Sequence, residues 1–233
     1  LLRAFPQPYG WLPDGARAAP GDIANISGTP LADAVRSKFF KAVTFGYIFA
    51  LGAQVGGALQ LVKLVEERTD RSTATLATIV LSTMSIVSRF AAGRIIPKLN
   101  MTRFTVGLAA MQGVSLASLG LINNRIGLLL AIGLFGITIG NMVMMQSLLL
   151  AERFGVRDYP RIAARSGLIS FSGTALGPLL LGWLYDVAGG YRSSYLAAGV
   201  CSIIGAILFS FAGSASVASD DFVSAEVTSA KSQ

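Results

Sequence analysis

Six long apolar stretches are the feature that most constrains how this chain folds. Each is about as long as the hydrocarbon core of a bilayer is thick, a distance that an α-helix crosses in roughly 20 residues. A backbone in lipid must satisfy its hydrogen bonds internally, so we predict a transmembrane helix for each stretch and an all-α membrane protein as the fold class. The predicted spans are residues 42–64, 72–96, 104–124, 126–151, 164–185 and 193–213.

The composition agrees with a membrane protein and excludes several other classes. Of the 233 residues, 53% are hydrophobic and only 13% are charged, which is too few charges for a water-solvated surface. Histidine is absent and Cys201 is the one cysteine, so the sequence has no internal disulfide and none of the common His/Cys metal sites. No nucleophile is paired with a base, and there is no Gly-Lys-Ser/Thr phosphate loop. We predict no enzymatic activity, no cofactor and no metal.

The basic residues indicate an orientation in the membrane. The formal net charge of +7 is compatible with nucleic-acid binding or with membrane orientation, and the placement of the charges decides between them. Counted loop by loop, 14 of the 19 lysines and arginines lie on one side of the predicted spans. Because cytoplasmic loops carry such an excess, we predict that both ends of the chain are cytoplasmic. The expected location is the cell membrane, or the inner membrane in a bacterium, with no nucleic-acid partner.

The chain divides into three predicted parts. Residues 1–41 are rich in Pro, Gly, Ala and Asp and are expected to be a cytoplasmic linker, with a short amphipathic helix over residues 32–41. Residues 42–213 form the six-helix bundle, and residues 214–233 are expected to be a disordered cytoplasmic tail. Since the sequence begins with leucine, we expect that an upstream part precedes it.

A faint internal repeat appears at an offset of 89 residues. Gly93 to Pro97 aligns with residues 182–186, and Arg68 aligns with Arg157. Each unit would hold three helices, and an odd number of spans inverts the second unit relative to the first. The sequence therefore predicts two inverted three-helix repeats. Chance similarity between glycine-rich membrane segments is the alternative.

Pairs of glycines four residues apart occur inside three of the predicted helices. Small residues at this spacing let helix backbones approach closely in a membrane, so we expect helix packing at these positions. A role in sliding or gating is the alternative. The pairs are Gly52/Gly56, Gly136/Gly140 and Gly173/Gly177.

Arg89 is the most informative single residue. It lies 17 residues into the second predicted helix, inside the apolar zone, where an arginine is costly unless it faces a cavity, an anion or a carboxylate. Four hydroxyl residues precede it at spacings of three and four, which gives the helix one polar face. The functional interpretation is a water-filled pathway in which the guanidinium binds an anion. The alternative, equally weighted, is an arginine that snorkels to the headgroups. The hydroxyl residues are Thr75, Thr78, Ser82 and Ser85.

Other polar residues lie inside the predicted helices. They are expected either to contact a substrate or to form hydrogen bonds between helices, and they are Tyr47, Gln54, Asn141 and Gln146. Gly177-Pro178 interrupts the fifth helix, because proline frees a backbone carbonyl, and it acts either as a hinge or as a static kink. Asp186 stands at the far end of that helix, where it is expected to cap or anchor a loop rather than to titrate.

Several segments resemble motifs of a known family. Gly93-Arg94-Ile-Ile-Pro97-Lys98 looks like the loop motif that follows the second helix of each half in the major facilitator superfamily, with Pro97 in place of the usual acidic residue and Asn100 in place of a glycine. Residues 177–182, from Gly177-Pro178 to Gly182, followed by Asp186, are similar to the eleventh-helix region of many members. The Arg-x-x-x-Gly of residues 89–93 is similar to the eighth helix of monocarboxylate transporters and oxalate/formate antiporters. The chain thus resembles the C-terminal half, helices 7 to 12, of such a transporter.

The resemblance implies an activity and a partner. It implies secondary transport of a small organic anion, chiefly a monocarboxylate, by symport or antiport with alternating access, in which Arg89 binds the substrate carboxylate and a further N-terminal six-helix half completes the site. Ser85 replaces the acidic residue that some monocarboxylate transporters carry four positions before the arginine, and the fifth span lacks the lysine of the oxalate/formate antiporters. Proton symport by that route and a dicarboxylate site are therefore not expected. A non-transporting membrane receptor or scaffold of the same fold is the alternative.

Overall fold

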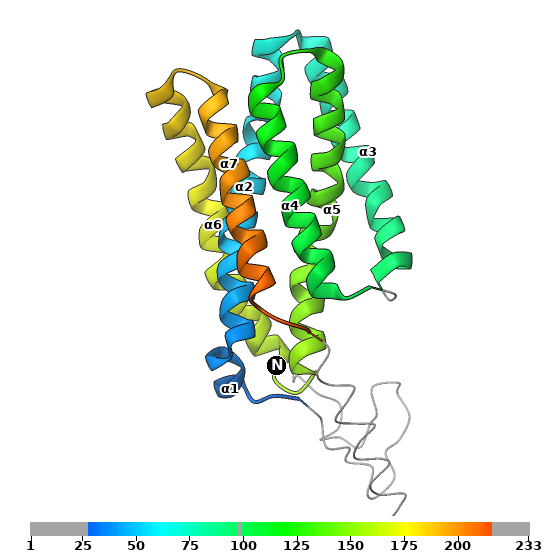
Figure 1. Cartoon of the computed structure of the whole chain (residues 1–233), viewed down its shortest axis with the longest axis vertical. Helices are drawn as coiled ribbons and strands as arrows, with labels where there is room; N and C mark the ends of the chain where they lie inside the picture. Colours follow the sequence, from blue (N-terminus) through cyan, green and yellow to red (C-terminus); the bar gives the residue numbers. More distant parts are fainter. Residues whose placement is uncertain (1–27, 97–98, 216–233) are drawn as a thin grey trace, which may run out of the picture.

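The computed structural model describes residues 28–96 and 99–215 of the chain (Figure 1). The described residues form seven α-helices. A short helix, α1, precedes six long ones, and the bounds are α1 Leu31–Arg36, α2 Lys38–Arg68, α3 Arg71–Ile95, α4 Met101–Leu121, α5 Arg125–Phe154, α6 Tyr159–Ala188 and α7 Tyr191–Ser210.

Six of these helices, α2 to α7, are long and apolar enough to cross a membrane. The structure thus confirms an all-helical bundle with six membrane-spanning candidates. Several of the helices extend beyond the predicted spans: α2 begins at Lys38 rather than at residue 42, and α6 begins at Tyr159 rather than at residue 164. The physical reason is that hydropathy marks only the part of a helix that suits the hydrocarbon, whereas charged turns continue the helix into the headgroup region.

Polar side chains fix where the helices begin. Asp70 accepts a hydrogen bond of 2.6 Å from the backbone N–H of Thr73 at the start of α3. Asn100 does the same for α4, and Asn124 for α5, each accepting from the backbone N–H three residues later. Such N-caps satisfy donors that have no partner within the helix. Hydrogen bonds from the Ser72 hydroxyl and from Thr73 lower the pKa of Asp70 to about 2.

The long helices pack against one another in a regular order across the bundle. α2 packs against α6 and α7, α5 packs against α3 and α4, and α4 packs against α7. Figure 1 shows α4 and α7 in front, with α3 and α6 at the two flanks. In the most apolar windows of α3 and α6, only 17% and 22% of the residues are buried, compared with 44–56% in the other four helices. α3 and α6 therefore present most of their surface to the outside of the bundle.

Glycines set the closest helix contacts, as the sequence predicts. In the α2–α6 seam, Gly52 lies against Gly173 and Gly177, so closely that a Cβ atom on Gly177 would collide with the Gly52 carbonyl. In the α3–α5 seam, the glycines are on α5 alone: Gly136 lies against the backbone of Leu81. Gly140 likewise lies against the carbonyl of Ser85 on α3.

Candidate functional site

Arg89 stands on α3, six residues before the last residue of that helix. Its Nε donates a hydrogen bond of 2.9 Å to the carbonyl of Gly140 on α5. The only ion pair in residues 28–96 and 99–215 joins Arg161 to Asp158, so no described carboxylate neutralises Arg89. The residue is otherwise exposed on the outer side of α3. The fork of its guanidinium is thus anchored at one nitrogen and open at its terminal nitrogens.

The hydroxyl residues that precede Arg89 follow the same face of α3. Thr75 and Thr78 are exposed and donate to carbonyls of their own helix, at 3.1 Å in each case. Ser82 is exposed, and its hydroxyl has no partner within the described part of the chain. Ser85 is half-buried, one helical turn before Arg89, where its backbone faces Gly140. The structure therefore places Ser82, Ser85 and Arg89 along one stripe of α3, which is exposed at Ser82 and Arg89 and meets α5 at Ser85.

Gln146 belongs to a second polar group, formed where α2, α5 and α6 meet. Its Nε2 donates to the hydroxyls of Ser166, at 3.1 Å, and Ser170, at 2.9 Å. Thr44 Oγ1 and Ser166 Oγ share a hydrogen bond of 2.9 Å, and the Ser170 hydroxyl donates to the Thr44 carbonyl. We call these four residues the hydroxyl cluster. Sequence reasoning found Gln146 and missed the other three, although Ser166 and Ser170 are four residues apart on α6 and thus share a face.

Tyr47 is fully buried beside the hydroxyl cluster and does not present its hydroxyl to a pathway. The hydroxyl donates to the carbonyl of Met142 at 3.0 Å, and the ring packs against Phe209 with centroids 4.8 Å apart. In this structure Tyr47 ties α2 to α5 and α7. Its hydrogen-bonding capacity as a donor is already used.

Gln54 and Asn141 are buried amides with unused capacity. Gln54 on α2 is 5% exposed and Asn141 on α5 is 2% exposed. Asn141 donates from Nδ2 to the carbonyl of Ile137, one turn earlier in its own helix. The side-chain oxygens of both amides have no partner among the residues that the structure describes. An unpaired buried acceptor is costly, so each oxygen is a place where a water molecule or a polar ligand group would be stabilised.

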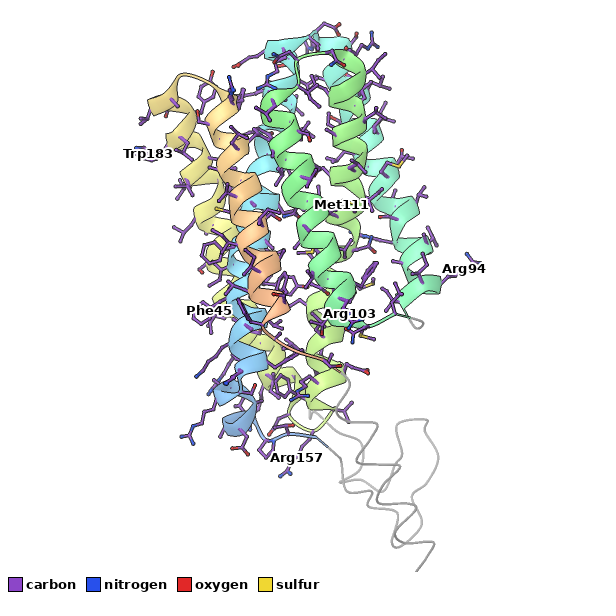
Figure 2. The ribbon with its side chains drawn as sticks, viewed as in Figure 1. Phe45, Arg94, Arg103, Met111, Arg157 and Trp183 are labelled. Carbon is purple, nitrogen blue, oxygen red and sulfur yellow. The ribbon has the colours of Figure 1, made fainter. Side chains whose placement is uncertain are left out.

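The motif residues divide between exposed and packed positions. Gly93 and Arg94 are exposed near the end of α3, and Figure 2 shows Arg94 projecting away from the bundle. Gly177 is buried in the α2–α6 seam, and Pro178 follows it inside α6. That helix runs without a break from Tyr159 to Ala188, so Pro178 removes one backbone donor without ending the helix. Gly182 is half-buried and Asp186 is exposed in the same helix.

Two further polar residues that the site prediction did not include hold the bundle together. The Arg68 guanidinium donates to the carbonyls of Leu119, Gly120 and Ile122, and so satisfies the C-terminal end of α4. Gln112 on α4 donates from Nε2 to the Ala50 carbonyl at 2.8 Å and to the Ser202 hydroxyl at 3.0 Å. These contacts link α2, α4 and α7 and are structural. In the sequence, Gln112 looks like any other polar residue in an apolar run, and Arg68 looks like any other charge in a loop between spans.

Comparisons with known proteins show no family for this chain. A scan against protein-family models gave no match, and a search of curated proteins gave no significant match. The family resemblance therefore stays a prediction.

Proposed function

We propose that this chain is the C-terminal six-helix half of a secondary transporter of the major facilitator type, which moves a small organic anion, chiefly a monocarboxylate. One observation carries the proposal. Arg89 lies within a helix that is apolar enough to cross a membrane, no described carboxylate pairs with it, and one hydrogen bond to Gly140 leaves its terminal nitrogens open. A planar fork with two free N–H donors matches the two oxygens of a carboxylate.

The helix pairing supports the transporter architecture. α5 begins 87 residues after α2, α6 begins 88 after α3, and α7 begins 90 after α4. The pairing of α2 with α6 and α7 corresponds to the pairing of α5 with α3 and α4. The third helices of the two units, α4 and α7, also pair with each other. This pattern is what two inverted three-helix units around a common axis would produce. The offset agrees with the repeat at 89 residues in the sequence.

The exposed face of the bundle supports the proposal that a further six-helix half packs against this chain. α3 and α6 are the least buried helices and carry large exposed side chains such as Phe90, Leu168 and Trp183. The stripe of Ser82, Ser85 and Arg89 lies on the exposed side of α3. We propose that another six-helix half covers this face and forms the second wall of the substrate site. Gln54, Asn141 and Gln146 would supply polar contacts from the α2 and α5 side during alternating access.

The test is uptake by the complete protein that contains this chain, reconstituted in proteoliposomes. Labelled formate, acetate and lactate are offered to the wild type and to Arg89→Gln and Arg89→Lys. We expect Arg89→Gln to lower the uptake rate at least ~10-fold, because it removes a charge-assisted pair of hydrogen bonds. Arg89→Lys keeps the charge without the fork and is expected to fall between the two.

Arg71→Gln is the matched control, because Arg71 is an exposed arginine at the other end of the same helix. Its uptake should equal that of the wild type. Unchanged uptake in Arg89→Gln would exclude Arg89 from the substrate site. Absence of uptake of every anion by the wild type would favour a receptor or scaffold instead.

A further inference from the structure

A lateral groove lies between α3, α4 and α5. Its volume is about 300 Å³, and apart from Ser88 and Asn141 its walls are apolar. It shares Phe104, Leu108 and Met111 with a wider hollow of about 500 Å³ that extends to the beginning of α4. Figure 2 shows the two ends of the wall that α4 contributes, with Arg103 near the start of the helix and Met111 farther along it. We call the two connected hollows the α3–α4 groove.

The α3–α4 groove is charged at one end only. Arg103 and Asn100 line the hollow at the start of α4, and Arg103 is exposed with no ion pair among the described residues. Asn100 and Arg103 also line a second hollow of about 410 Å³ on the other side of the same helix end, together with Thr102. Thr102 is 6% exposed, and its hydroxyl has no partner within the described ranges. The start of α4 thus combines a cation, a polar hollow and the positive end of a helix dipole.

A related groove on the other flank of the bundle lacks this polar end. It lies between α2, α6 and α7, has a volume of about 180 Å³, and is lined by apolar residues and Cys201, with no charged side chain. Its lining includes the apolar Ala53, whereas the lining of the α3–α4 groove includes the polar Asn141. Apolar grooves between helices are therefore common to both flanks, but only the α3–α4 groove of these two joins an apolar channel to an arginine.

We propose that the α3–α4 groove binds one anionic phospholipid, with the phosphate at Arg103 and an acyl chain along Phe104, Leu108 and Met111. The apolar walls match a hydrocarbon chain, and the arginine at the helix N-terminus matches a phosphate. From Asn100 to Met111 the helix rises about 16 Å, which is roughly half the thickness of a hydrocarbon core. A water-soluble anion would leave the apolar walls uncovered, so the charge and the groove together favour a lipid. The inference is independent of the transport proposal.

The test is native mass spectrometry, in detergent, of the complete protein that contains this chain. The protein is titrated with a phosphatidylglycerol and, separately, with a phosphatidylcholine of the same acyl chains. We expect the wild type to retain the anionic lipid about fivefold better, the factor that corresponds to one arginine at an anionic membrane surface. Arg103→Gln should remove this preference, and Arg103→Lys should keep most of it, because a lysine still pairs with phosphate.

Gly107→Leu tests the apolar part of the site. Gly107 lines the groove, and a Cβ atom there meets no atom within 4 Å, so a leucine would occupy the groove without disturbing the fold. The control is Gly167→Leu, a glycine on α6 whose Cβ would meet only the Phe171 ring at 3.8 Å. We expect Gly107→Leu to lose most lipid retention and Gly167→Leu to retain the lipid as the wild type does. Thermal unfolding checks that each variant is folded.

Four outcomes would overturn the proposal. These are equal retention of the two lipids by the wild type, undiminished retention by Gly107→Leu, equal loss in the Gly167→Leu control, and displacement of the lipid by glycerol 3-phosphate. The last result would mean that the site recognises the phosphate alone. None of these outcomes bears on anion uptake, so the two proposals fail separately.

Discussion

The α2–α6 seam and the α3–α5 seam use the same kind of helix pairing with different residues. In the α2–α6 seam, Gly52 on one helix meets Gly173 and Gly177 on the other. Eighty-eight residues before Gly177 stands Arg89, and 88 residues after Gly52 stands Gly140, the residue whose carbonyl Arg89 binds. Positions 88 residues apart thus hold a glycine-to-glycine contact in one seam and an arginine in the other. At these positions the α2–α6 seam holds only backbone packing, whereas the α3–α5 seam adds a charge to it.

The hydroxyl residues differ in the same way. Ser170 on α6 is held by Gln146 and the Thr44 carbonyl, whereas Ser82, which stands 88 positions earlier on α3, is exposed and has no partner in the described ranges. Ser166 and Ser170 of α6 are thus engaged within the bundle, whereas Ser82 of α3 is exposed. The α3 side of the molecule therefore has the free hydrogen-bonding capacity that a ligand needs.

The largest expected effect is in the α2–α6 seam. Gly177→Ala should destabilise the protein by about 2 kcal/mol, because the new methyl group collides with the backbone of Gly52, which has no side chain to move aside. Thermal or denaturant unfolding in detergent measures this loss of stability. Gly167→Ala on the same helix is the control and should be neutral or slightly stabilising. Equal stability of the two variants would mean that the seam is looser than the contact indicates.

The same substitution in the α3–α5 seam should cost less. We expect Gly140→Ala to destabilise by about 1 kcal/mol, since its new methyl group overlaps less with the Ser85 carbonyl than the methyl group of Gly177→Ala does with the Gly52 carbonyl. Gly140→Ala should also weaken the contact between Arg89 and the Gly140 carbonyl. For the same loss of stability, we therefore expect Gly140→Ala to reduce the rate of anion uptake more than Gly177→Ala does. A larger loss of stability for Gly140→Ala than for Gly177→Ala would reverse the comparison.

Gln146→Leu tests whether the hydroxyl cluster holds α5 to α6. The change removes two hydrogen bonds and leaves Ser166 and Ser170 without their donor, so we expect a loss of about 0.6–1.7 kcal/mol, the range for polar contacts between membrane helices. The control is Gln60→Leu, because the side-chain oxygen of Gln60 is buried and unpaired. Removing that amide should be neutral or stabilising. Equal destabilisation by both changes would argue against a specific role for the cluster.

The smallest expected effect concerns the caps of the two flanking helices. Asp70 caps α3, whereas Asp158, 88 residues later, accepts from the backbone N–H of Leu31 and does not cap α6. The folded pKa of Asp70 is lowered from 3.8 to about 2, so its stabilising contribution is complete above pH 3.8 and is lost as the pH falls towards 2. The melting temperature of the wild type should therefore fall more steeply over this range than that of Asp70→Asn, which caps without titrating. Parallel curves would contradict the assignment.

The sequence predicts the helices and their close contacts well. Six apolar stretches become six long helices, and the predicted glycine pairs lie in two of the tight seams, because both depend on local periodicity and residue size. The stripe from Ser82 to Arg89 likewise follows from spacing along one helix. The hydrogen-bond partners of Tyr47 and Gln146 do not follow from the sequence. The carbonyl of Met142 and the hydroxyls of Ser166 and Ser170 lie on other helices, and only the tertiary structure brings them close.

What the sequence determines alone is therefore the all-helical bundle, its six membrane-spanning candidates and the unusual position of Arg89, since the cost of backbone and charge in hydrocarbon acts on each helix separately. What the tertiary structure decides is the use of each polar group. Arg89 is anchored to Gly140, the hydroxyls of α6 are engaged while Ser82 on α3 is free, and a groove beside α4 joins Arg103 to apolar walls. These outcomes depend on which helix lies beside which, and periodicity within one helix carries no information about its neighbours.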